Sequence, residues 1–230
     1  MKDVLGSAIA GYYHKISAGK LWVHSKYGPR EEMPVEVYFR TADDMPELEW
    51  QALRHCRGRV LDIGAGAGSH ALFLQQSGMN VTALDISPKA AKVIQARGVQ
   101  NVLHENFFEL KAYTKYDTLL LLMNGIGLAG TLDGLHNFFQ KARKLLRPGG
   151  QLIFDSSDIA YLYKGRPPKT GPYYGEVLYQ YEYLRQRSDW FHWLFIDKKT
   201  LTTIAQKEGW RVGLLYKEPS GQYLVRCQPH

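Results

Sequence analysis

Short apolar runs and amphipathic stretches follow one another through the middle of the chain. Runs with the length of buried strands occur at 60–63, 80–84, 101–104, 116–123 and 151–155. Between them, apolar residues recur at helical spacing at 69–76, 88–97 and 133–146. Strands that alternate with helices in this way predict an α/β fold with a parallel sheet and helices on both faces.

Capping residues mark the boundaries of several predicted helices. Ser87 is the expected N-cap of the helix at 88–97, because its hydroxyl can accept a bond from a free backbone N–H of the first turn. The Pro-Gly-Gly sequence at 148–150 is expected to separate the helix at 133–146 from the strand that follows it.

The pattern is less regular at the N-terminus. Residues 1–45 mix a helical stretch at 4–13 with turn-forming residues, and we expect them to form a cap segment over the main domain. A further helix is predicted at 46–57, with Asp43 and Asp44 as candidate N-caps.

The pattern changes again after residue 156. Aromatic and apolar residues alternate with polar ones at 177–183 and at 191–195, which predicts two antiparallel strands. A helix at 198–208 and a closing hairpin with strands at 210–216 and 223–227 are expected to follow.

Length and composition indicate one globular domain. The chain has 230 residues, of which 45% are hydrophobic, so we expect a domain at 46–230 with an antiparallel insertion near 156–197. Its apolar runs are too short to cross a bilayer and its start does not resemble a signal peptide, which predicts a cytoplasmic protein without a membrane partner. The two cysteines, Cys56 and Cys227, match no metal-ligand spacing, so no metal site is predicted.

The chain is basic, with a formal net charge of +7. Such a charge permits an anionic partner, but the lysines and arginines are scattered along the sequence instead of forming one run. A solvated basic surface is therefore favoured over a nucleic-acid groove.

The strongest motif is the glycine-rich segment Asp62-Ile63-Gly64-Ala65-Gly66-Ala67-Gly68, placed between a predicted strand and a predicted helix. Glycines allow the backbone to turn sharply and to approach a ligand closely. A dinucleotide fingerprint, with its third glycine three positions after the second, would need glycine at 69, where this chain has Ser69. Asp85 ends the next strand, where a carboxylate can accept hydrogen bonds from two ribose hydroxyls. A turn or capping role for Asp85 is the alternative.

These segments together resemble the motifs of class I S-adenosylmethionine-dependent methyltransferases. The matching stretches, which share their order with the family, are 60–68, 83–87, 104–110, 116–124 and 146–152. The resemblance implies a Rossmann-like sheet of seven strands, mostly parallel, with an antiparallel last strand. It also places the insertion near 156–197 on the substrate side.

The resemblance implies S-adenosylmethionine as the cofactor, held by residues spread over the motifs. The expected cofactor-binding residues are Arg40, Asp62, Gly64, Ala65, Gly66, Gly68, Asp85, Ile86, Asn106, Phe107 and Asn124. Asn106 stands where the family usually has an acid that contacts the adenine amine. Arg40 resembles an arginine that holds the methionine carboxylate in some members, although a surface role is equally compatible with its position.

The sequence leaves the reaction partly open. Methyl transfer from a sulfonium needs alignment more than acid–base chemistry, so no catalytic residue is named; Asp158 could be a base or a turn cap. A small-molecule acceptor is the leading hypothesis. An RNA or DNA methyltransferase and a non-enzymatic S-adenosylmethionine-binding module are the alternatives, and the sequence does not indicate an oligomeric state.

Overall fold

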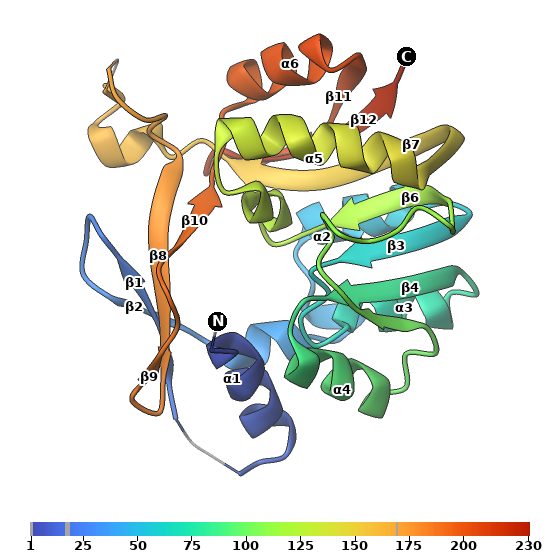
Figure 1. Ribbon diagram of the computed structural model, residues 1–230, viewed down its shortest axis with the longest axis vertical. Coiled ribbons are helices and arrows are strands. Elements are labelled where there is room, and N and C mark those ends of the chain that lie inside the picture. The colour runs from blue at the N-terminus through green and yellow to red at the C-terminus, as the bar shows by residue number, and fades with distance from the viewer. Residues whose placement is uncertain (1, 17–18, 169) are drawn as a thin grey trace. The chain divides into compact units, whose positions relative to one another are not determined.

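A computed structural model describes residues 2–16, 19–168 and 170–230 (Figure 1). The chain forms two compact units. Unit 1 contains residues 1–45, 61–110 and 178–191, and unit 2 contains residues 46–60, 111–177 and 192–230.

The seven-stranded sheet has the order β11-β12-β7-β6-β3-β4-β5. Its strands are β3 (Arg59–Ile63), β4 (Asn80–Asp85), β5 (Val102–His104), β6 (Tyr116–Leu121), β7 (Leu146–Ser157), β11 (Trp210–Lys217) and β12 (Gln222–Pro229). The pairs β4–β5 and β6–β7 are parallel, whereas β12 runs antiparallel to both β7 and β11. This confirms the predicted mostly parallel α/β sheet with an antiparallel last strand.

A second sheet has the order β10-β8-β1-β2, with β9 paired to β8. Its strands are β1 (Leu21–Ser25), β2 (Glu31–Met33), β8 (Glu176–Tyr183), β9 (Gln186–Arg187) and β10 (Phe191–Leu194). The antiparallel strands expected at 177–183 and 191–195 are therefore present. Neither β1 nor its pairing with β8 was predicted, because the apolar run Leu21-Trp22-Val23 hides the alternation that indicates a strand.

The helices lie where hydrophobic periodicity placed them. The α-helices are α1 (Val4–Tyr13), α2 (Glu47–His55), α3 (Ser69–Gln76), α4 (Pro88–Ala96), α5 (Leu132–Leu145) and α6 (Lys198–Lys207). The described residues also form short 3₁₀ helices, η1 (Val35–Phe39), η2 (Ala42–Asp44), η3 (Gly125–Ala129) and η4 (Ala160–Tyr163). In unit 1, α3 and α4 pack against β4, and α1 packs against α4; in unit 2, α6 packs against β11.

The start of α2 differs from the prediction. Pro46 is the N-cap instead of a first-turn residue, and its side chain forms no capping bond. Asp43 and Asp44 do not cap α2. Asp44 instead accepts hydrogen bonds from the backbone N–H and the hydroxyl of Thr41, in a capping box at the N-terminus of η2.

The strand predicted at 151–155 begins earlier than expected. β7 starts at Leu146, directly after α5, and includes the Pro-Gly-Gly sequence at 148–150. Its register against β6 shifts between Tyr116 and Thr118, where Gly149 has φ +76°. A bulge at this glycine lets the strand pass through a sequence that usually interrupts secondary structure.

Within the described residues, no helix is long and apolar enough to cross a membrane. The same residues contain no group of three or more His, Cys, Asp or Glu side chains arranged to hold a metal ion.

Candidate functional site

The glycine loop of unit 1 joins the end of β3 to α3. Gly64, Gly66 and Gly68 have φ of +74°, +60° and +83°, a left-handed conformation that costs other residues free energy. The backbone N–H groups of Gly64 and Ala65 donate to the carbonyl oxygen of Leu84, over 2.8 and 3.1 Å. These bonds hold the loop against the end of β4.

The loop is open at one glycine and covered at another. A Cβ built on Gly64 would have no atom within 4 Å, whereas a Cβ on Gly66 would lie 2.9 Å from Cδ1 of Tyr38. The Ser69 hydroxyl donates to the Tyr38 carbonyl oxygen over 2.8 Å, which holds η1 beside the start of α3. Tyr38 was not singled out from the sequence, because it belongs to no motif of the loop.

Asp85 lies directly beside this loop. Its Oδ2 accepts the backbone N–H of Gly66 over 2.9 Å, and its Oδ1 accepts that of Ser87 over 2.8 Å. Burial raises the pKa of Asp85 to about 6, although these two bonds oppose the shift. The N-cap of α4 is Ser87, whose hydroxyl accepts the Ala90 N–H, so Asp85 does not cap that helix. Each carboxylate oxygen keeps a further lone pair for a ligand hydroxyl.

Asp62 is a second buried carboxylate of unit 1. Its Oδ2 is buried without a hydrogen-bond partner in the described part of the chain. Burial raises the pKa of Asp62 to about 6, opposed by the charge of His70 and by the backbone N–H of Ala71. A buried oxygen without a partner can accept a hydrogen bond from a ligand, for example from the ammonium group of a bound amino acid.

The residue after Asp85 is an exposed aliphatic one. The Ile86 side chain is 67% exposed, which suits a surface that a flat, apolar ring would cover. Phe107 is 5% exposed and lies edge-to-face with the more accessible Phe108, at 5.4 Å between ring centroids. The Asn106 side-chain oxygen accepts the Phe108 N–H over 3.0 Å, so the amide caps a turn. The predicted contacts of Asn106 and Phe107 with adenine stay predictions.

Arg40 follows η1 and is half-buried. The pKa of Asp44 lies below its usual range because of the bonds from Thr41 and, to a smaller extent, the charge of Arg40. Arg40 therefore lies close enough to the η2 capping box to act on it electrostatically. Its proposed contact with a methionine carboxylate stays a prediction.

Asn124 belongs to unit 2 and has a structural role there. Met123 and Asn124 both have left-handed backbones, with φ of +59° and +56°. The Asn124 side chain donates to the Leu194 carbonyl oxygen over 3.2 Å and accepts the Ser156 hydroxyl over 2.9 Å. Its backbone N–H donates to Asp155. These bonds use both ends of the side-chain amide within unit 2, and a cofactor contact stays a prediction.

Unit 1 thus brings together most of the predicted cofactor-binding residues from the glycine loop and the end of β4. They are Asp62, Gly64, Ala65, Gly66, Gly68, Asp85 and Ile86. An open glycine turn, a carboxylate with free lone pairs and an exposed aliphatic side chain fit a nucleoside whose ribose lies on Asp85 and whose base lies on Ile86.

Comparison with known proteins decides the family. A family model described as a methyltransferase domain matches residues 39–214. A SAM-dependent methyltransferase from Bacteroides fragilis, solved in complex with S-adenosyl-L-homocysteine, is 40% identical, covers 99% of this chain and 95% of its own, and gives a TM-score of 0.92. The chain belongs to the S-adenosylmethionine-dependent methyltransferase family. This methyltransferase therefore has the predicted family, enzyme class and cofactor.

More distant relatives agree with the fold. The CcbJ methyltransferase of Streptomyces caelestis is 14% identical, with 86% of this chain and 99% of its own covered, at a TM-score of 0.62. A Geobacillus protein (strain WCH70), named only as a candidate methyltransferase, is 25% identical over 132 residues, which are 51% of this chain and 53% of its own. The methyltransferase spans about half the length of the curated relatives it matches first.

Proposed function

We propose that this methyltransferase transfers the methyl group of S-adenosylmethionine to a small, largely apolar acceptor. The observation that carries the proposal is the loop of unit 1, where Gly66 donates its backbone N–H to the carboxylate of Asp85. The bond orients the carboxylate beside the glycine turn, where it can accept the two ribose hydroxyls of the cofactor. A cytoplasmic location is part of the same proposal.

Methyl transfer requires the protein mainly to align the acceptor atom with the methyl group. The bound cofactor supplies an activated methyl group on a positively charged sulfur, which is a good leaving group. The residues of the loop hold the nucleoside, and Tyr38 covers Gly66 on one side of it. Catalysis then consists mainly of holding the acceptor atom in line with the methyl group and keeping water out.

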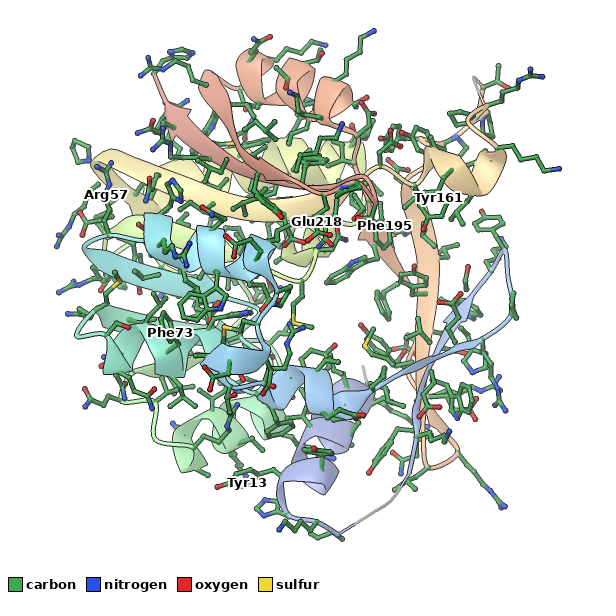
Figure 2. The ribbon with its side chains drawn as sticks, turned by 180° about the vertical axis from the view of Figure 1, so that it is seen from behind. Tyr13, Arg57, Phe73, Tyr161, Phe195 and Glu218 are labelled. Atoms are coloured by element: carbon green, nitrogen blue, oxygen red, sulfur yellow. The ribbon has the colours of Figure 1, made fainter. Side chains whose placement is uncertain are left out.

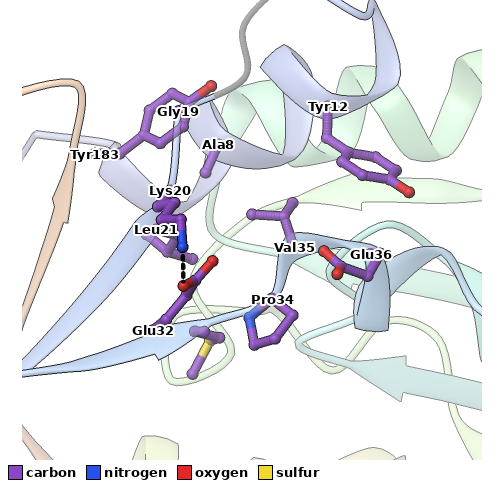
Figure 3. A pocket seen from close by; sticks show the side chains of 11 residues that line it. Ala8, Tyr12, Gly19, Lys20, Leu21, Glu32, Pro34, Val35, Glu36 and Tyr183 are labelled. Carbon is purple, nitrogen blue, oxygen red and sulfur yellow. Dashed lines mark hydrogen bonds and ion pairs between the residues drawn. The ribbon is translucent and has the colours of Figure 1, made fainter.

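A cavity of unit 1 supports a small acceptor (Figure 3). Its volume is about 280 Å³, and α1, β1, β2 and the start of η1 contribute its lining. Leu21, Met33 and Val35 give it apolar walls, and the Lys20–Glu32 ion pair, at 2.6 Å, lies at its exposed side. A cavity of this size lies near the lower end of the range of small-molecule pockets, roughly 300–1,000 Å³, which supports a small acceptor.

Tyr38 connects this cavity with the glycine loop. Its ring covers Gly66, and its hydroxyl donates to the thioether sulfur of Met33, over 3.0 Å, which itself lines the cavity. Burial raises the pKa of Tyr38 well above its usual range, with smaller contributions from Tyr181 and Asp85. Tyr38 is therefore a neutral phenol at physiological pH, which cannot act as a base and whose single hydroxyl proton is donated to Met33.

Aromatic residues of β8 and β10 extend the apolar surface. Tyr181 lies 5.0 Å from Phe191, and Tyr179 lies 6.5 Å from it, between ring centroids. Burial raises the pKa of Tyr181 as well, so this phenol also stays neutral. Such a surface supports a ring-containing acceptor, because aromatic faces and edges pair with other rings.

Two measurements test the proposal. Isothermal titration should show that S-adenosylhomocysteine binds with a micromolar dissociation constant, which corresponds to about −8 kcal/mol. The same titration with NAD⁺ should show no binding. Labelled S-adenosylmethionine should then transfer its methyl group to a metabolite extract and not to RNA or DNA. Transfer to nucleic acid with steep salt dependence would favour the polymer alternative, and binding without transfer to any acceptor would favour the non-enzymatic module.

A variant pair refines the acceptor part of the proposal. Tyr181→Phe removes a neutral phenol from the aromatic surface while keeping its ring. We expect it to raise the KM for the acceptor with an unchanged dissociation constant for S-adenosylhomocysteine. Trp22 lies in β1 on the opposite face of the sheet from Tyr181. Trp22→Phe is therefore the control, and it should change neither the KM for the acceptor nor the dissociation constant for S-adenosylhomocysteine.

A further inference from the structure

One carboxylate serves the N-termini of two helices. Asp3 is the N-cap of α1, and its Oδ1 accepts the backbone N–H of Gly6 over 3.0 Å. Its Oδ2 accepts the hydroxyl of Ser87 over 2.7 Å, and the backbone N–H of Lys89 lies 3.4 Å from the same oxygen. Asp3 therefore joins the first turn of α1 to the first turn of α4.

Ser87 also bonds to Asp85, which lies beside the glycine loop. Its backbone N–H donates to Oδ1 of Asp85 over 2.8 Å, and Oδ2 of Asp85 accepts the N–H of Gly66 over 2.9 Å. The Ser87 hydroxyl also accepts the Ala90 N–H as the α4 N-cap. A series of hydrogen bonds thus links Asp3 through Ser87 to Asp85, the carboxylate proposed to bind the ribose.

The helices pack closely at this point. A Cβ built on Gly6 would collide with the Ser87 hydroxyl, so glycine is what allows α1 to approach. Figure 1 shows α1 beside α4. Two further bonds tie these helices along their length. Lys89 donates to the Ser7 hydroxyl over 2.7 Å, and Tyr13, labelled in Figure 2, donates to the Ala96 carbonyl oxygen over 3.2 Å. The Tyr13 bond lies at the opposite end of α4 from Asp85.

We infer that Asp3 is a positioning residue for cofactor binding: by holding Ser87 it fixes the orientation of Asp85, so ribose binding depends on α1 being docked on α4. The inference rests on the proposed function, because it takes Asp85 as the group that binds the ribose. A carboxylate that is already oriented loses less rotational freedom when the ligand binds, and this difference appears as affinity.

The test separates the two bonding roles of Asp3. Asp3→Ser keeps an oxygen that can cap α1, but its shorter side chain cannot reach Ser87. We expect S-adenosylhomocysteine to bind about three- to tenfold more weakly, which is the effect of one net hydrogen bond. A 2′,3′-dideoxy analogue lacks the hydroxyls and should bind wild type and Asp3→Ser equally, a difference that general destabilisation would not produce.

Two further variants keep the test decisive. Gly6→Ala favours the helix but pushes the Ser87 hydroxyl aside, and should weaken S-adenosylhomocysteine binding as Asp3→Ser does. Tyr13→Phe breaks the bond at the far end of α4 and should bind like wild type. An unchanged affinity in both Asp3→Ser and Gly6→Ala, or an equal loss in Tyr13→Phe, overturns the inference. No binding by wild type would instead overturn the proposed function.

Discussion

The backbone N–H of Asn124 donates to both carboxylate oxygens of Asp155, over 3.0 and 2.9 Å. The same carboxylate accepts the side-chain amide of Gln222 over 2.9 Å and is fully buried. Asn124 and the residue before it have left-handed backbones, which few non-glycine residues adopt. Asp155 thus stabilises a strained turn between β6 and η3.

Removing this carboxylate should destabilise the methyltransferase. Asp155→Ala leaves the buried N–H of Asn124 without an acceptor, so we expect the free energy of unfolding to fall by about 1–3 kcal/mol. Asp155→Asn keeps one acceptor oxygen and should cost less. Chemical denaturation of both variants at pH 7 measures the difference, and equal stability of Asp155→Ala and wild type would refute the role assigned to the bond.

Cofactor affinity should depend on pH through Asp85. Its pKa in the ligand-free protein is raised to about 6, so the carboxyl takes up a proton as the pH falls below that value. A ribose hydroxyl donates better to the charged form, so binding opposes protonation. We expect the dissociation constant for S-adenosylhomocysteine to rise about tenfold at most between pH 7 and pH 5. Asp85→Asn should bind more weakly at pH 7 and lose the part of this dependence that comes from Asp85.

The glycine at position 66 offers a second test of the loop. Gly66→Ala combines a left-handed backbone with a Cβ that lies 2.9 Å from Tyr38. Gly98→Ala has φ of +100° but no atom within 4 Å, and therefore reproduces the backbone strain alone. Both variants should lose about 1 kcal/mol or more of stability, but only Gly66→Ala should weaken S-adenosylhomocysteine binding in titration. Equal affinities would show that the loop does not contact the cofactor.

Ile86 should affect binding without affecting stability. Its side chain is 67% exposed, so Ile86→Ser is expected to change the free energy of unfolding by less than about 0.5 kcal/mol. Loss of an apolar contact with adenine should weaken S-adenosylhomocysteine binding by about 1 kcal/mol. Ile16→Ser makes the same substitution at another exposed isoleucine and is the control. A similar affinity for both variants would place the base elsewhere.

Local sequence determined much of this structure. The helix predicted at 69–76 is α3 with the same bounds, because a left-handed glycine begins it and Ser77-Gly78 ends it. The sequence also led us to expect Asp85 beside the glycine loop, since their motif depends on backbone geometry that few residues provide, and the two are bonded through Gly66. Their contact with the cofactor stays a prediction.

Features that depend on distant contacts could not be predicted in this way. Tyr38 covers the loop from a segment without a recognisable motif, and the role of Asp3 depends on a bond to Ser87, 84 residues away. Asn124 was expected to bind the cofactor because of its place after a strand. Its contacts with Ser156 and Leu194 come from other elements, which no local pattern shows.

The pairing of β1 with β8 has a consequence for how the nascent chain folds. His24 bonds to Glu182 across 158 positions, and the antiparallel register extends from Leu21 opposite Tyr183 to Ser25 opposite Tyr179. Contacts so far apart in sequence require a large loop to close, which is slow and costs chain entropy. During synthesis β1 can pair with β2 soon after both are made, but its other edge has no partner until β8 has left the ribosome. In the meantime that unpaired edge is open to association with other chains.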